Sequence, residues 1–395
     1  MNKVRLGIIG TGNKGLRLGI VGLGNMGAAH ARSVLEGKIP RMELAAVCDT
    51  NPDKLEFDSQ VKTFTRSEEL IRSGAVDAVL IATPHYSHTT IGIDALKNGL
   101  HVLVEKPISV HKADCERLIA AHTNKRQVFA AMFNQRTDPF FQKVRKLLRS
   151  GKLGEIRRVN WIVTNWFRTE AYYASGGWRA TWAGEGGGVL LNQCPHNLDL
   201  FQWIFGMPKR VRAFCTMGRY HNIEVEDDVT AYFEYANGAT AVFIASTGEA
   251  PGTNRLEIAG ERGRVVYEND ELRFMRNEVE MSKFSRTSKQ AFATPSTWDV
   301  RIPLSGHGGQ HNEILCNFAN AILDNAPLIA PAQEGIHSVE LANAILFSSL
   351  QGKTIEFPLD AKAYERKLKQ LVAGSKFKKP QKTEKSASDF AQSFR

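Results

Sequence analysis

A chain of 395 residues is long enough for two domains, and 43% hydrophobic and 23% charged residues are typical of a globular protein with a full-sized core. No apolar run approaches the roughly 20 residues of a membrane helix, and the short, glycine-broken apolar stretch at the N-terminus lacks an export cleavage site, so we expect a cytoplasmic protein. The formal charge of +10 is concentrated in residues 361–395, where ten basic and three acidic residues give +7. Nucleic-acid binding usually requires a basic patch on the folded surface together with a recognition motif. A basic tail alone does not meet this requirement, so nucleic acid is not an expected partner.

The five cysteines are far apart and form no CxxC pair. This spacing predicts neither a disulfide framework nor a zinc cluster, and we expect reduced thiols and no metal site. The cysteines are Cys48, Cys115, Cys194, Cys215 and Cys316.

A glycine-rich turn follows the apolar run 17–21 and precedes a helical pattern. A second apolar run, 43–48, ends at Asp49. The order strand, glycine turn, helix, strand and acid predicts a dinucleotide-binding unit, with the phosphates at the helix N-terminus. The expected cofactor-binding residues of this turn are Gly22, Gly24, Asn25, Met26 and Gly27.

The glycine fingerprint occurs twice. Residues 5–15 (RLGIIGTGNKG) and 17–27 (RLGIVGLGNMG) are identical at eight of eleven positions. Asp49 lies 22 residues after Gly27 but 34 after Gly15, and an acid is expected about 20 residues beyond the glycines. The second copy is therefore the predicted cofactor site. An extra strand, a loose extension and a duplication scar all stay open for the first.

The carboxylate of Asp49 is expected to accept hydrogen bonds from the adenosine ribose hydroxyls and to repel a 2′-phosphate. This predicts NAD as the cofactor, with NADP less favoured.

Strand and helix patterns alternate up to about residue 134. Strands are expected at 76–82, 100–104 and 127–133, and helices at 88–97 and 113–122. This alternation predicts an α/β Rossmann domain with a doubly wound parallel sheet over residues 1–134, whose ligands bind at the carboxyl ends of the strands. The candidates at those ends are Thr83, Pro84, His88, Glu105, Lys106 and Asn134.

Hairpin signals replace this alternation after residue 135, where Asn237-Gly238 separates two strand-like runs. We expect a second domain over residues 135–360 and a basic tail over 361–395, disordered from Lys376 onward. The expected strands of the second domain are 159–163, 211–217, 228–235, 240–246, 255–259 and 265–267.

The triplet Glu105-Lys106-Pro107 and the later run of three glycines (186–188) with His196 and Asp199 carry a resemblance. Over about residues 16–358 the chain resembles the Gfo/Idh/MocA family (glucose-fructose oxidoreductase, inositol dehydrogenase, rhizopine catabolism). The resemblance implies an NAD-dependent dehydrogenase acting on a secondary hydroxyl of a sugar, glycoside or cyclitol. It also implies a C-terminal α/β domain with a large open, mainly antiparallel sheet, through which a homodimer or homotetramer would form.

Removal of a hydride from an alcohol leaves a hydroxyl proton, so the site needs a base and a positive donor. Lys106 suits the donor role, and in the family this lysine contacts the substrate hydroxyl and the nicotinamide ribose. His196, in the first turn of an expected helix from Pro195, suits the base, because a helix N-terminus disfavours imidazolium.

The chain departs from the family pattern at Asn192, where many members carry an aspartate, and at Cys194, where glycine is usual. An amide orients a hydroxyl but does not accept its proton, so Asn192 is expected to contact substrate and His196 to carry the proton. Further substrate contacts are expected from an aromatic segment and from a glycine loop before a helix at 312–323. They are Arg168, Trp178, Arg179 and His311.

Two other classes of function stay open. One is a glycosidase that retains NAD and oxidises its substrate transiently to permit elimination. The other is a nonenzymatic NAD-sensing protein, which only the basic tail favours.

Overall fold

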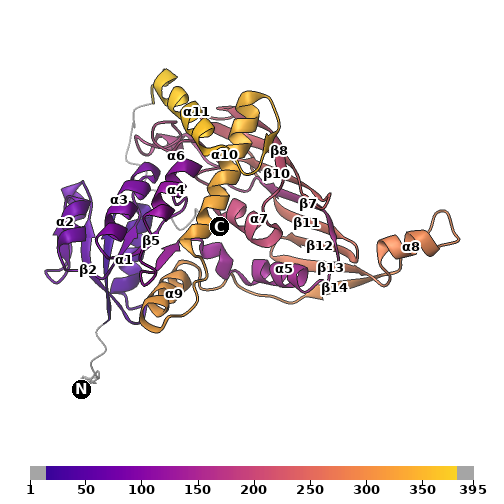
Figure 1. Cartoon of the computed structure of the whole chain (residues 1–395), viewed down its shortest axis with the longest axis horizontal. Helices are drawn as coiled ribbons and strands as arrows, with labels where there is room; N and C mark the ends of the chain where they lie inside the picture. The colour runs from indigo at the N-terminus through magenta and orange to yellow at the C-terminus, as the bar shows by residue number, and fades with distance from the viewer. Residues whose placement is uncertain (1–14, 380–395) are drawn as a thin grey trace.

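The computed structural model describes residues 15–379. They form two β-sheets, each with helices packed against it (Figure 1). The first glycine copy, apart from Gly15, and residues 380–395 lie outside the described residues. Within 15–379, no helix has the length and apolar character needed to cross a membrane.

The N-terminal sheet has six strands in the order β3-β2-β1-β4-β5-β6, with every neighbouring pair parallel. This is the doubly wound order of a Rossmann domain and confirms the predicted fold class. Strands β4 and β5 are almost completely buried, as expected of a parallel sheet covered on both faces. The strands are β1 (Leu16–Val21), β2 (Met42–Cys48), β3 (Lys62–Phe64), β4 (Ala78–Ile81), β5 (His101–Val104) and β6 (Phe129–Ala131).

Four helices connect these strands. They are α1 (Asn25–Leu35), α2 (Ser67–Arg72), α3 (His85–Lys97) and α4 (Lys112–Ala120). A later helix, α9 (Gln310–Asp324), returns to this domain, because its apolar residues Ile314, Leu315 and Phe318 belong to the same buried cluster as β1 and β5.

The C-terminal sheet has nine strands in the order β14-β13-β12-β11-β7-β10-β9-β8-β15, and only β7 and β10 pair in parallel. The predicted hairpin at Asn237-Gly238 joins β9 to β10, and Gly238 has φ +86°. The strands are β7 (Ile156–Val163), β8 (Arg210–Met217), β9 (Glu226–Glu234), β10 (Thr240–Ser246), β11 (Asn254–Gly260), β12 (Gly263–Glu268), β13 (Glu271–Asn277), β14 (Thr297–Ile302) and β15 (Ile355–Glu356).

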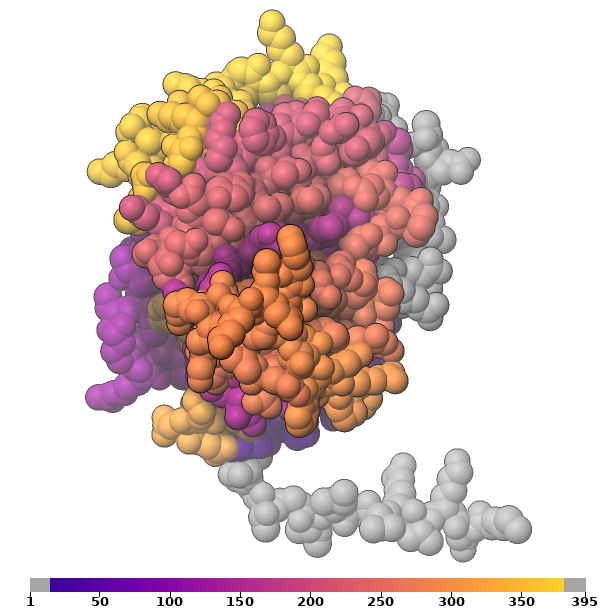
Figure 2. Space-filling view, turned by 90° about the vertical axis from the view of Figure 1, so that its right-hand side faces the viewer, coloured from indigo at the N-terminus to yellow at the C-terminus, as the bar shows by residue number. Residues whose placement is uncertain are grey.

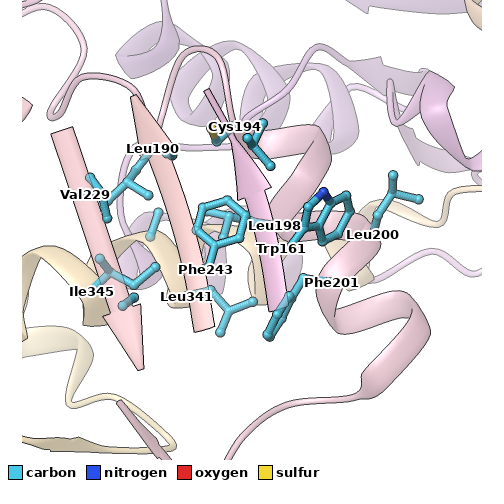
Figure 3. Close-up of a cluster of buried hydrophobic side chains, with 14 of the residues drawn as sticks. Trp161, Leu190, Cys194, Leu198, Leu200, Phe201, Val229, Phe243, Leu341 and Ile345 are labelled. Carbon is cyan, nitrogen blue, oxygen red and sulfur yellow. The ribbon is translucent and has the colours of Figure 1, made fainter. Parts of the chain in front are cut away.

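Helices α5 (Pro139–Arg149), α7 (Pro195–Phe205) and α10 (Gly335–Gln351) pack on this sheet. Figure 3 shows how Trp161 and Phe243 from the strands meet Phe201 of α7 in one buried cluster, with Leu341 of α10 beside them. This core holds α7, the helix whose first turn contains the predicted catalytic His196, against the sheet.

Helix α8 (Met281–Thr287) lies in the connection between β13 and β14, at the end of the molecule farthest from the Rossmann domain (Figure 1). It stands in front when the molecule is viewed from that end (Figure 2). It has no buried residue, so it adds little to the core.

The basic tail predicted over residues 361–395 begins with a helix. Residues Ala361–Gly374 form helix α11, capped by Asp360, and bury Tyr364 and Leu368 in the core of the second domain. Disorder from Lys376 onward is contradicted up to Lys379, whose amine donates hydrogen bonds to the carbonyl oxygens of Gly176 and Arg179. The remainder of that segment lies outside the described residues.

A buried ion pair ties the chain just after β6 to helix α7. Arg136, just after β6, donates to both carboxylate oxygens of Asp199 in α7, at 2.7 Å from Nε and 2.6 Å from an Nη atom, and both side chains are only 1% exposed. A bidentate pair of this kind is geometrically specific, and removal of one partner leaves a buried charge uncompensated.

We therefore expect Asp199→Ala to lower the free energy of unfolding by about 3–5 kcal/mol. The exposed pair Arg72–Asp94 provides the control, since Asp94→Ala should cost less than about 1 kcal/mol. Urea unfolding followed by circular dichroism measures both variants, and equal losses would contradict a structural role for the buried pair.

Candidate active site

The glycine turn between β1 and α1 has the geometry of a phosphate cradle. Gly22 has φ +92°, and a Cβ there would lie 2.7 Å from the carbonyl oxygen of Ala82. A Cβ on Gly27 would lie 1.8 Å from the carbonyl oxygen of Gly22. Gly24, in contrast, has open space in front of it and precedes α1 without a side-chain cap, so the first-turn N–H groups are available to an anion.

Asp49 secures this turn from the end of β2. Its carboxylate accepts a hydrogen bond from the Leu23 amide at 2.7 Å and from the Asn51 amide at 2.9 Å, and Lys54 Nζ lies 3.2 Å away. The acid that the sequence singles out thus touches the glycine turn itself.

Other cofactor candidates line the carboxyl ends of β4, β5 and β6. The hydroxyl of Thr83 and the side-chain oxygen of Asn134 are buried without a hydrogen-bond partner among residues 15–379, as expected of groups that face a ligand. The Asn134 amide donates to Gln310 at 2.6 Å. Pro84 precedes α3, whose first residue is His85. Open space at Gly24 and these orphaned oxygens fit a dinucleotide along this edge.

Two of the predicted cofactor residues form hydrogen bonds within the scaffold. Both ring nitrogens of His88 are engaged at 2.8 Å, by the carbonyl oxygens of Pro107 and Thr83. The carboxylate of Glu105 lies 2.7 Å from His30 Nε2, and although burial opposes ionisation, this hydrogen bond lowers the Glu105 pKa to about 2. His30 thus holds Glu105 at the end of β5, and direct contact of His88 and Glu105 with a cofactor stays a prediction.

Lys106 and Asn192 meet across the domain boundary. Lys106 follows β5 and donates from Nζ to the backbone oxygen of Asn192 at 3.0 Å. Burial lowers the Lys106 pKa, assisted by Arg179 and Arg168 and opposed by Glu105 and Glu185. The structure therefore brings the predicted lysine to the segment that leads into α7.

His196 lies in the first turn of α7, as predicted, and is 6% exposed. Its Nδ1 is buried without a hydrogen-bond partner within residues 15–379. Burial, with Lys106 and His311 nearby, holds the pKa of His196 well below its usual value of 6.5. A neutral imidazole with an unused ring nitrogen is suited to accept a proton.

His311 approaches the same point from α9. Burial lowers its pKa to about 4, and its ring packs against His30 at 5.5 Å between centroids. The helix begins at Gln310, one residue before His311, so this histidine lies in the first turn rather than in the preceding loop.

The aromatic segment forms a wall beside Asn192. The Tyr172 hydroxyl donates to Asn192 Oδ1 at 3.1 Å and accepts from Arg179 at 2.8 Å. Arg168 lies over the Tyr172 ring at 5.1 Å, and Trp178 packs edge-on against His85 at 5.6 Å. The segment thus contacts both Asn192 and His85, the first residue of α3.

The sequence prediction missed Glu185. It is 2% exposed, and its carboxylate accepts hydrogen bonds from the Ala180 amide at 2.6 Å and from the side chain of Asn192. A carboxylate is therefore present beside Asn192, where the family aspartate is missing. Its position between Gly184 and Gly186 is the one local signal that pointed to it.

Comparison with known proteins identifies the family. Residues 16–133 match the oxidoreductase family with an NAD-binding Rossmann fold, and residues 141–266 match the GFO/IDH/MocA C-terminal domain. The scyllo-inositol 2-dehydrogenase (NADP(+)) of Bacillus subtilis is 26% identical over 73% of this chain and 81% of its own length. Inositol 2-dehydrogenase of Corynebacterium glutamicum is 26% identical over 64% and 76%.

Solved structures agree over nearly the whole chain. The WlbA dehydrogenase of Chromobacterium violaceum in complex with NADH and UDP-GlcNAcA is 25% identical, with a TM-score of 0.76 over 90% of this chain and 100% of its own. The WlbA dehydrogenase of Bordetella pertussis with the same ligands is 26% identical, with a TM-score of 0.73 over 88% and 100%. This chain belongs to the Gfo/Idh/MocA family of oxidoreductases and carries its NAD-binding domain.

Proposed function

We propose that the protein is an NAD-dependent dehydrogenase that oxidises a secondary hydroxyl of a sugar or cyclitol. The observation that carries this proposal is the convergence of Lys106 from the Rossmann domain and His196 from the second domain near Asn192. The inositol dehydrogenases and sugar-nucleotide-bound dehydrogenases among its relatives support the substrate class.

When bound, NAD supplies the hydride acceptor, and the protein's own residues manage the proton and the charge. Neutral His196 accepts the hydroxyl proton. The Lys106 ammonium stabilises the developing alkoxide from a position fixed by the Asn192 carbonyl. Asn192 and Tyr172 orient neighbouring hydroxyls, because an amide and a phenol both donate and accept hydrogen bonds.

Screening sugars and cyclitols with NAD tests this function through the absorbance of the reduced nicotinamide. Net reduction with at least one polyol is the expected result. Cleavage of a glycoside without net reduction would instead favour the glycosidase.

Substitution of the proposed acid–base groups should affect chemistry more than cofactor binding. We expect Lys106→Ala and His196→Ala each to lower kcat/KM by about 10²–10⁴-fold, with NAD affinity nearly unchanged. Asn192→Ala should act mainly on KM, because Asn192 only orients the substrate. Steady-state kinetics with a substrate deuterated at the reacting carbon measure these effects, and wild-type activity in His196→Ala would remove His196 from the mechanism.

The pH dependence should reflect the lowered pKa of His196. A base is active when unprotonated, so oxidation is lost only as pH falls through its pKa, which burial places below 6.5. We therefore expect kcat/KM for oxidation to be retained at pH 6.5 and to decline only in more acidic solution. If kcat/KM instead falls to half of its maximum above pH 7, and this dependence disappears in His196→Gln, the result would contradict a neutral buried histidine.

Asp49 should select NAD over NADP, since its carboxylate faces the glycine turn and repels a 2′-phosphate. We expect NAD to bind at least about tenfold more tightly, or about 1.4 kcal/mol. Calorimetric titration of both cofactors measures this difference. Gly24→Val, which fills open space without a clash, should abolish NAD binding, whereas Gly12→Val in the first copy should not.

We further propose a homodimer or homotetramer formed through the C-terminal sheet. Phe214 of β8, Tyr232 of β9 and Trp298 of β14 are 64%, 42% and 58% exposed on this sheet. Large exposed apolar side chains on an open sheet are typical of an interface. Light scattering after size exclusion should give a multiple of 43.9 kDa, and a monomer would contradict the assembly.

A further inference from the structure

The wall of the candidate substrate site is rich in cations. Two guanidinium groups flank the Tyr172 ring, Arg179 at 4.6 Å and Arg168 at 5.1 Å from its centroid. Lys106 lies within electrostatic range of both, and Lys379 lies within range of Arg179. Four positively charged groups therefore gather on one side of the candidate site.

The carboxylates that face these cations already have partners within the protein. Glu185 accepts from Asn192 and from the Ala180 amide, and Glu105 is paired with His30. Glu224, between β8 and β9, adds a third carboxylate, which accepts from the Trp182 amide and the Ser375 hydroxyl. Within residues 15–379, these three carboxylates against four cations leave an excess of one positive charge.

One of these cations also has an unused donor. Arg179 donates from one terminal nitrogen to the Tyr172 hydroxyl, but its Nε is buried without an acceptor among the described residues. A buried donor without a partner is costly, and a charged one more so. An acceptor supplied by a ligand removes that cost.

We propose that the substrate is an acidic sugar, whose carboxylate or phosphate lies against Arg179 and the Tyr172 ring. This inference rests on the proposed dehydrogenase function and names its substrate class. An anionic group neutralises the excess charge and supplies the missing acceptor, and charge-assisted hydrogen bonds to guanidinium are strong and directional.

The C-terminal segment takes part in this recognition. Lys379 Nζ binds the carbonyl oxygens of Gly176 and Arg179, and its pKa is lowered by burial and by Arg179 while Glu185 opposes the shift. Ser375 contacts Glu224, which in turn holds the Trp182 amide. The segment thus fixes both ends of the loop that carries Arg179 and adds a positive charge to its rim.

Matched pairs of neutral and acidic sugars test the proposal. The panel is glucose with glucuronate and with glucose 6-phosphate, galactose with galacturonate, and the methyl glycosides of glucose and glucuronic acid. We expect kcat/KM for the acidic member of at least one pair to exceed that of its neutral partner by at least about tenfold, and this ratio to fall with added salt. The uronate and phosphate arms distinguish the two sources of negative charge.

Charge substitution at Arg179 gives the internal test. Arg179→Gln should reduce the acidic-to-neutral ratio to within about threefold of unity, and Arg179→Lys should restore part of it. Arg72→Gln removes a surface arginine paired with Asp94, far along the chain from the site, and should leave the ratio unchanged. Calorimetry of glucuronate and glucose with the NAD-loaded protein gives the same comparison without turnover.

Two truncations isolate the C-terminal segment. Truncation after Gly374 removes Lys379 and should weaken the acidic preference, whereas truncation after Lys379 should retain it. Equal kcat/KM and equal affinity for neutral and acidic members would overturn the acidic substrate while leaving the dehydrogenase function intact. Failure of every sugar and cyclitol to reduce NAD or to bind would count against the proposed function itself.

Discussion

The buried ion pair between Arg136 and Asp199 fixes the geometry on which the site depends. Asp199 lies three residues after His196 on α7, and Arg136 follows the last strand of the Rossmann sheet. The same guanidinium donates to the carbonyl oxygen of Ile329 and to Glu334, so three separate segments converge on one side chain. Since neither charge has access to water, each must keep its partner, and α7 is held in register with the cofactor edge.

A second buried pair acts at the other end of the domain boundary. Lys112, at the start of α4, donates to Glu340 of α10 at 2.7 Å and to the Leu359 carbonyl at 2.9 Å. Helix α10 also packs on β8 and α7, so it helps to hold α7 in place. The relative position of Lys106 and His196 therefore depends on polar ties as much as on apolar packing.

Local patterns in the sequence were sufficient to predict the Rossmann sheet and most of the second sheet. Glycine spacing, apolar runs and the Asn237-Gly238 turn report on structure within a few residues, so their predictions agree with β1, β2, β4, β5 and the β9–β10 hairpin. Strands β3, β13, β14 and β15 were not predicted. The residues of β14 (TWDVRI) do alternate between polar and apolar, although the structure leaves this strand mostly exposed. The return of α9 to the N-terminal core also went unseen, because it depends on contacts between segments some 200 residues apart.

The residues of the candidate site likewise fall into those that local motifs predict and those that long-range packing brings in. Lys106, His196 and Asn192 lie in recognisable motifs, and the structure brings them together. Glu185 and Lys379 reach the site only through long-range packing, so no local pattern predicts Lys379 beside Arg179.

The three glycines before Asn192 illustrate how backbone packing creates the site. The structure gives these glycines a packing role. A Cβ on Gly186 would lie 2.1 Å from a Val110 methyl, and one on Gly188 would lie 2.0 Å from the carbonyl oxygen of Glu226. The segment therefore passes between the Rossmann domain and the start of β9 at a spacing that only glycine permits.

Glu226 completes this passage, since its carboxylate accepts the amides of Gly188 at 2.8 Å and Leu190 at 3.0 Å, while burial raises its pKa to about 7. These hydrogen bonds to Glu226 fix the backbone path of residues 188–190. The same segment continues to Asn192, which contacts Lys106, and to His196 in the first turn of α7. The three glycines thus contribute to the site indirectly, through close packing of the backbone. They allow the two parts of the chain to approach closely enough for Lys106 and His196 to lie in one candidate site.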